Sequence, residues 1–156
     1  MSSISTMANL DIVGTVHAKL TGPDGSVKLD AVYKNLVVTS GKEYIAAKLH
    51  ASVVGGVSDV SEMAIGSGTA LPMSADLALQ TELERVAFSV APVRTGRTVT
   101  FTAIFLPTTG LGTRPITEAG IFNTDVTPRM LNRVVFPVVN KEDADTLEIS
   151  WDITIN

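Results

Sequence analysis

The segment DTLEISWDITI, residues 145–155, alternates polar and apolar side chains without a break. This period of two places the apolar side chains on one face of a strand and the polar side chains on the other. Thr, Ile and Trp also favour an extended backbone. A sheet with one apolar face needs a second layer to cover it. The segment therefore predicts a half-buried antiparallel strand in a layered β domain.

Other parts of the chain carry similar patterns. Residues 10–20 and 27–33 alternate on either side of the turn Gly22-Pro23-Asp24-Gly25, which predicts a β-hairpin. Residues 97–106 form a second strongly alternating strand. Shorter strands are expected within 63–65, 82–90, 116–123 and 130–136. The sequence thus predicts a mainly β fold, an antiparallel β-sandwich or jelly-roll-like domain of about eight strands.

One short α-helix interrupts this pattern. We expect it over Lys42–His50, with Ser40 as the N-cap and Glu43 as its capping-box partner. The 156 residues fit one domain. Residues 1–9 are Ser-rich and read as a flexible N-terminal arm, followed by a single β-sandwich domain over residues 10–156.

Composition limits the classes of partner. The chain has 12 Lys and Arg against 16 Asp and Glu, a net charge of −4, which argues against sequence-independent binding to nucleic acid. No apolar run reaches the roughly 18 residues that span a bilayer, so no membrane partner is expected. Charged residues make up 18% and the mean hydropathy is +0.29. This balance indicates that a partner covers part of the surface.

Motifs for chemistry are weak. The chain has no cysteine, so thiolate and disulfide chemistry are excluded. His17 and His50 lie in different elements without motif partners, and Ser67, within Gly66-Ser67-Gly68, completes neither a nucleophile elbow nor a phosphate loop. We therefore expect no cofactor, no metal, no catalytic residue and no small-molecule substrate.

Glu118 stands out because it lies in an otherwise apolar strand. A buried carboxylate costs several kcal/mol unless it is paired, so it needs a partner. Arg85 and Arg133 lie in strand-like surroundings and are the candidates. A charge pair that fixes the strand register is favoured over a catalytic acid, since no second acid, His or nucleophile lies nearby in the sequence.

Several segments resemble small virion proteins of tailed bacteriophages. They are 35–41 (NLVVTSG), 63–69 (MAIGSGT), 83–85 (LER), 117–123 (TEAGIFN), 130–133 (MLNR), 136–141 (FPVVNK) and 145–151 (DTLEISW). The resemblance covers about residues 30–156, and the block TEAGIFN is its most specific part. Related blocks also occur near the N-termini of phage tail-fibre proteins.

The resemblance implies a non-enzymatic capsid cement (decoration) protein, made in the host cytoplasm and located on the capsid surface of the virion. Its partners would be the major capsid protein and copies of itself, as a dimer or trimer. A short tail-fibre or baseplate adaptor is the alternative, and a carbohydrate-binding jelly roll is a third. The arm and the loop after residue 107 are the candidate contacts, with residues Met1, Ser2, Ser3, Ile4, Thr108, Thr109, Leu111 and Arg114.

Overall fold

The computed structural model describes residues 11–50, 58–125 and 127–156. This part of the chain holds nine strands and one helix. In chain order they are β1 (Ile12–Thr21), β2 (Val27–Val37), α1 (Thr39–His50), β3 (Val60–Gly66), β4 (Glu82–Ala87), β5 (Val93–Thr95), β6 (Thr98–Phe105), β7 (Arg114–Asn123), β8 (Met130–Lys141) and β9 (Thr146–Ile155).

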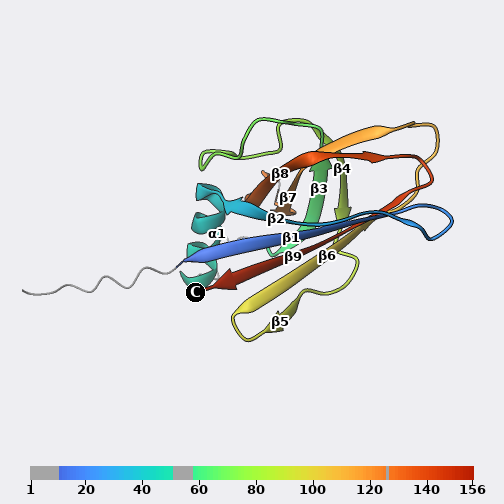
Figure 1. The fold of residues 1–156 in the computed structure, drawn as a ribbon. Coiled ribbons are helices and arrows are strands. Elements are labelled where there is room, and N and C mark those ends of the chain that lie inside the picture. The colour runs from blue at the N-terminus through green and yellow to red at the C-terminus, as the bar shows by residue number, and fades with distance from the viewer. Residues whose placement is uncertain (1–10, 51–57, 126) are drawn as a thin grey trace, which may run out of the picture.

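The strands form one antiparallel sheet in the order β4-β3-β7-β8-β2-β1-β9-β6-β5. The sheet curls over on itself into two facing layers, and α1 lies at one end of them (Figure 1). We call β2, β1, β9, β6 and β5 layer A, and β8, β7, β3 and β4 layer B. The layers join at β2 and β8, which share two residue pairs, Leu36–Arg133 and Val37–Asn132.

The opposite sides of the two layers also meet. Phe88 N donates to Ser61 O of layer B at 2.9 Å, and Ser89 N donates to Thr102 O of layer A at 2.9 Å. The residues that follow β4 therefore bridge the layers and bring the two ends of the sheet together. The prediction of a mainly β, antiparallel, sandwich-like fold with one short helix is confirmed.

Strand β9, the segment from which the fold was predicted, lies in the middle of layer A. It pairs with β1 over ten residues and with β6 over eight. Its apolar side chains face the core, where Trp151 and Ile149 are fully buried. On its outer face Thr154, Asp152 and Ser150 hydrogen-bond to the threonines of β6. Period-two alternation thus separates a packed face from a polar face.

The prediction of about eight strands agrees with the nine observed, of which the short β5 between β4 and β6 is the additional one. The predicted start of the helix needs correction. Helix α1 begins at Thr39, and the carbonyl of Val38 accepts the N–H groups of Gly41 and Lys42. Ser40 is thus inside the helix instead of capping it, and its hydroxyl donates to Met130 O at 2.8 Å. The hydroxyl of Ser40 therefore bonds to β8, and the predicted capping box with Glu43 does not form.

Candidate functional site

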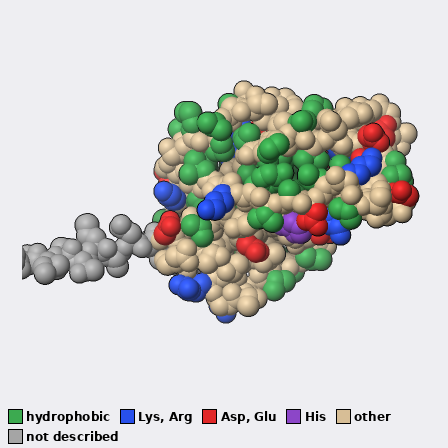
Figure 2. Space-filling model, in the orientation of Figure 1, with side chains coloured by type: hydrophobic (Ala, Val, Ile, Leu, Met, Phe, Trp, Pro, Cys, Tyr) green, Lys and Arg blue, Asp and Glu red, His purple; other side chains and the backbone are tan. Residues whose placement is uncertain are grey.

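The loop between β3 and β4, residues 67–81, exposes three large apolar side chains. Leu71, Met73 and Leu77 are 79%, 62% and 70% exposed. Figure 2 shows hydrophobic side chains gathered over this loop. Leu79 points the other way, is 8% exposed, and packs in a small apolar cluster with Val38, Ala64, Phe122 and Met130. We call residues 67–81 the apolar loop.

A fully buried carboxylate, Glu118 of β7, anchors both ends of the apolar loop. Its Oε1 accepts the backbone N–H of Gly68 at 2.9 Å and that of Thr81 at 2.7 Å. Its Oε2 accepts the backbone N–H of Gln80 at 3.0 Å. The carboxylate therefore closes the loop at its base, where residues far apart in the loop meet.

Glycines make this approach possible. A Cβ added to Gly68 would lie 2.5 Å from Oε1 of Glu118, and a Cβ added to Gly66 would lie 2.6 Å from the same atom. Both distances are shorter than any side chain tolerates, so the backbone needs glycine to reach the carboxylate. The hydroxyl of Thr117 adds a bond to Gly68 O at 2.7 Å. The backbone of Gly66-Ser67-Gly68 thus packs directly against the Glu118 carboxylate.

Arg133 connects the base of the loop to its middle. It is 2% exposed, and its Nε and Nη2 donate to Oε2 of Glu118 at 3.0 and 2.8 Å. Its Nη1 donates to Oδ2 of Asp76 at 2.8 Å, and that oxygen also accepts the backbone N–H of Met73 at 2.9 Å. The two donors converge on one oxygen of Glu118, and each hydrogen bond is strengthened by the charges of both groups. One guanidinium therefore fixes the backbone next to an exposed methionine.

Three further hydrogen bonds hold the rest of the apolar loop. Oε1 of Gln80 accepts the N–H groups of Thr69 and Ala70 at 2.9 and 3.0 Å. The backbone carbonyl of Ser74 accepts the N–H of Thr39, the first residue of α1, at 2.8 Å. The loop is thus tied to β7, β8 and α1 while its apolar tip remains in solvent.

The pKa of Glu118 lies below its ordinary value. Burial raises this pKa, but the three backbone N–H donors and the Arg133 guanidinium lower it further than burial raises it. The group is therefore an anion at neutral pH with both oxygens engaged as acceptors. This chemistry suits a structural anchor and not a proton donor.

This shift predicts an acid-sensitive fold. Because the folded pKa is below the unfolded value of about 4.5, the stabilisation is fully present above pH 4.5 and is lost as the pH falls through the folded pKa. We expect Glu118→Gln to be less stable at pH 7 but to lose less further stability on acidification. Denaturant unfolding at pH 7 and at about pH 3 gives the free energy of unfolding at each pH, and the change between the two is the slope that is compared. Equal slopes in the two proteins would contradict it.

Of the two arginines predicted as partners of Glu118, Arg133 pairs with it and Arg85 does not. Arg85 binds Glu82 at 2.7 Å and Glu62 at 3.6 Å, and its guanidinium stacks 3.9 Å from the centroid of Phe122. Strand order explains the difference, because β8 is hydrogen-bonded directly to β7 whereas β4 is separated from β7 by β3.

The sequence predicts two partner contacts, the N-terminal arm and the loop between β6 and β7, and the apolar loop was not among them. Thr109 and Leu111 are exposed, Leu111 by 59%. Thr108 is partly buried, and its backbone N–H donates to Asp143 O at 2.7 Å. Side-chain oxygens of Asp143 accept the N–H groups of Gly110 at 2.9 Å and Leu111 at 3.2 Å, so this loop is also held in place.

Arg114, also predicted as a partner contact, is buried within its own chain. It is the first residue of β7, is 8% exposed, and donates to Oε2 of Glu84 at 2.7 Å. Its register partner on β8 is Lys141, which is fully buried and donates to Leu106 O at 3.1 Å. Burial and the nearby Arg114 lower the pKa of Lys141. Both cations therefore belong to the packed end of the sandwich.

The other predicted contacts, Met1, Ser2, Ser3 and Ile4, lie outside the described residues.

Within residues 11–50, 58–125 and 127–156, no cluster of three or more His, Asp or Glu side chains could hold a metal ion. The same ranges contain no helix that is long and apolar enough to cross a membrane. His17 hydrogen-bonds Oδ1 of Asp30 at 2.5 Å on the outer face of layer A. The side chain of His50 lies outside what is described.

The sequence alone did not reveal Asp76 and Gln80, which bind backbone N–H groups inside the apolar loop. The sequence signal that could have found Asp76 is its position three residues after Met73, because an Asp side chain often accepts hydrogen bonds from nearby backbone N–H groups.

Comparison of the chain with protein-family models, with curated proteins and with solved structures found no match.

Proposed function

We propose that this protein is a structural component of tailed-phage virions, a capsid cement protein that binds the outer capsid lattice through the apolar loop. The observation that carries the proposal is the fixed presentation of Leu71, Met73 and Leu77. Large apolar side chains cost free energy in water, and burying each in an interface stabilises it by about 1.5–3 kcal/mol. Such a surface favours a protein partner.

The anchoring bonds matter for affinity as well as for shape. Association costs about 0.5–1.5 kcal/mol for each flexible side chain that it orders, and more when a loop must also be ordered. The apolar loop is already held by Glu118, Arg133 and Asp76. A lattice protein repeats the same contact many times, so a modest preorganised contact can yield strong overall binding.

The resemblance to small phage virion proteins also supports the proposal, because its segments converge on this site. Gly68 belongs to the block MAIGSGT, Glu118 to TEAGIFN and Arg133 to MLNR. These three residues meet at one carboxylate. Three of the seven blocks that carry the resemblance therefore build the apolar loop's anchor.

Replacing Leu71, Met73 and Leu77 together by Ser tests the function. We expect binding to purified capsids, measured by co-sedimentation, to fall by about tenfold or more, because a combined loss of about 1.4 kcal/mol from the three contacts lowers the affinity tenfold. The matched control is Val90→Ser with Val93→Ser, two exposed apolar residues elsewhere on the chain. It should bind like the parent protein.

The same assay on purified tails separates the alternatives. Binding to tails and not to heads would replace the cement proposal with the tail-fibre or baseplate adaptor. Undiminished capsid binding by the triple variant, with an unchanged unfolding transition, would remove the apolar loop from the contact. A glycan-binding role is less favoured, because the single tryptophan, Trp151, is fully buried.

A further inference from the structure

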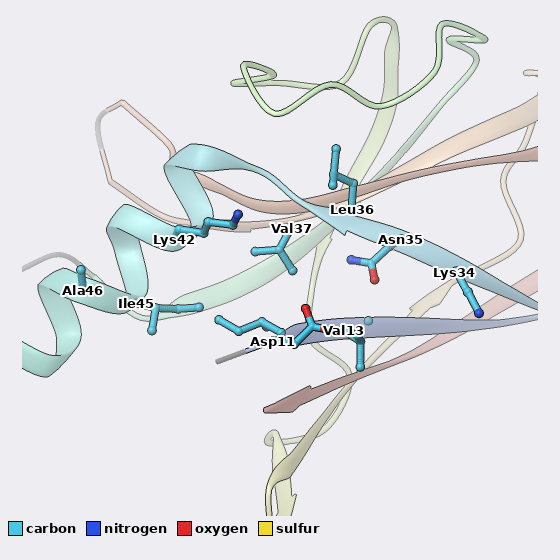
Figure 3. A pocket seen from close by; sticks show the side chains of 11 residues that line it. Asp11, Val13, Lys34, Asn35, Leu36, Val37, Lys42, Ile45 and Ala46 are labelled. Carbon is cyan, nitrogen blue, oxygen red and sulfur yellow. The ribbon is translucent and has the colours of Figure 1, made fainter. Parts of the chain in front are cut away.

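A groove opens at the end of the sandwich where α1 lies. It has a volume of about 600 Å³ and is lined by the start of β1, the end of β2 and one side of α1 (Figure 3). A second, apolar cavity of about 200 Å³ lies beside it and shares Ile12, Val37 and Ile45 with it. We call the two together the α1 groove.

The α1 groove combines apolar walls with one unusual amide. Val13 and Leu36, which line it, are 40% and 37% exposed. The Asn35 side chain lies over Gly14, where an added Cβ would be 1.7 Å from its Oδ1. Its Oδ1 and Nδ2 are shielded from solvent and have no hydrogen-bond partner in the described part of the chain.

An unpaired, shielded carboxamide costs about 1–3 kcal/mol. Its acceptor and donors would complement a peptide group if the side chain turned from Gly14 toward the groove, and such a bond would relieve this cost. Apolar walls around such an amide suit a peptide segment that carries apolar side chains. They suit a charged small molecule less, because most of the lining side chains are uncharged.

We propose that the α1 groove binds residues 1–10 of a second copy of this chain. Those residues, MSSISTMANL, have apolar side chains at every third position, Met1, Ile4, Met7 and Leu10, and no charged side chain. A polyproline-II chain has three residues per turn, so it would place all four on one side. Burying this segment would desolvate no charged side chain.

The length and origin of the segment fit this occupant. The ten residues precede Asp11, which lines the α1 groove, and could reach about 35 Å when extended. Asp11 still pairs with Asn156 beside β9, with Asn156 N donating to Asp11 O at 2.8 Å. This pairing keeps Asp11 in line with β1 at the end of the sheet. A neighbouring copy is therefore the natural acceptor.

Cysteine cross-linking tests the proposal cleanly because the chain contains no cysteine. A full-length Ile4→Cys protein is mixed with a full-length Ala46→Cys protein under mild oxidation. Ala46 lines the α1 groove and is exposed, so its replacement should leave the fold intact. The control acceptor is Val32→Cys, which is 64% exposed on β2 and outside the groove.

We expect the Ile4–Ala46 disulfide between two copies to form about tenfold faster than the Ile4–Val32 disulfide. Adding Met7→Asp to the Ile4→Cys chain should reduce the rate to that of the control. Equal rates for the two acceptors would overturn the proposal. An intramolecular disulfide in the Ile4→Cys/Ala46→Cys protein, with no link between copies, would show binding within one chain and also overturn it.

This inference deepens the proposed function and rests on it for the supply of neighbouring copies, but its test needs no capsid. Loss of capsid binding in the apolar-loop variant with rapid Ile4–Ala46 cross-linking retained would separate the two surfaces. Failure of cross-linking beside normal capsid binding would reject the α1 groove contact and leave the cement proposal standing.

Discussion

Glu118→Ala is expected to lower the free energy of unfolding by about 3–5 kcal/mol. The substitution leaves the Arg133 guanidinium, which is 2% exposed, without its main counter-ion. It also removes the acceptor of the backbone N–H groups of Gly68, Gln80 and Thr81. Urea unfolding followed by circular dichroism at pH 7 measures the change.

Glu82→Ala is the matched control for Glu118→Ala. It also removes a glutamate that pairs with an arginine, but the Glu82 side chain is 34% exposed, so a loss of at most about 1 kcal/mol is expected. The Glu118→Ala/Arg133→Ala protein should lose less than the sum of the single losses, since the two groups act as a unit. A loss below about 1 kcal/mol for Glu118→Ala would show that the carboxylate is not an anchor.

Trp151→Ala is expected to cost about 3–5 kcal/mol, the range for a large aromatic side chain removed from a core. Trp151 is fully buried in the middle of layer A, opposite Val16 on β1 and Phe101 on β6. Its indole Nε1 has no hydrogen-bond partner within the described ranges, so the loss would come from packing alone. Thermal or urea unfolding gives the value.

Val32→Ala serves as the control for Trp151→Ala, since a valine that is 64% exposed should change stability by about 0.5 kcal/mol or less. A small effect of Trp151→Ala, close to that of the control, would mean that β9 is not central to the core. A large effect would support the interpretation that this segment decides the fold.

The fold was predictable where one face of a strand is exposed. In β9 and β6 the alternation of side chains matches the alternation of burial, so the strands and their inward faces could be predicted. In β7 the pattern fails, because nine of its ten residues are buried. Its inner face packs on the core, and the face that carries Glu118 lies under the apolar loop. A strand covered on both faces shows no period of two.

The site was predictable in its chemistry but not in its geometry. A carboxylate in an apolar strand had to be paired, and that argument identified Glu118 from sequence alone. The choice of Arg133 over Arg85 depends on strand order, which no local pattern specifies. The helix start shows the same limit, because Ser40 bonds to Met130, a residue ninety positions away. Tertiary contacts of this kind override local capping preferences.

The closure of the sheet limits how copies of the protein can associate. Unpaired strand backbones are templates on which further chains add to form fibres. Here β5 is three residues long, β4 carries Glu82, Glu84 and Arg85, and Phe88 and Ser89 join the two ends of the sheet. Addition of further chains to the sheet edges is therefore disfavoured, even at high local concentration. Copies of the protein would instead associate through side-chain surfaces, whose contacts form and break reversibly.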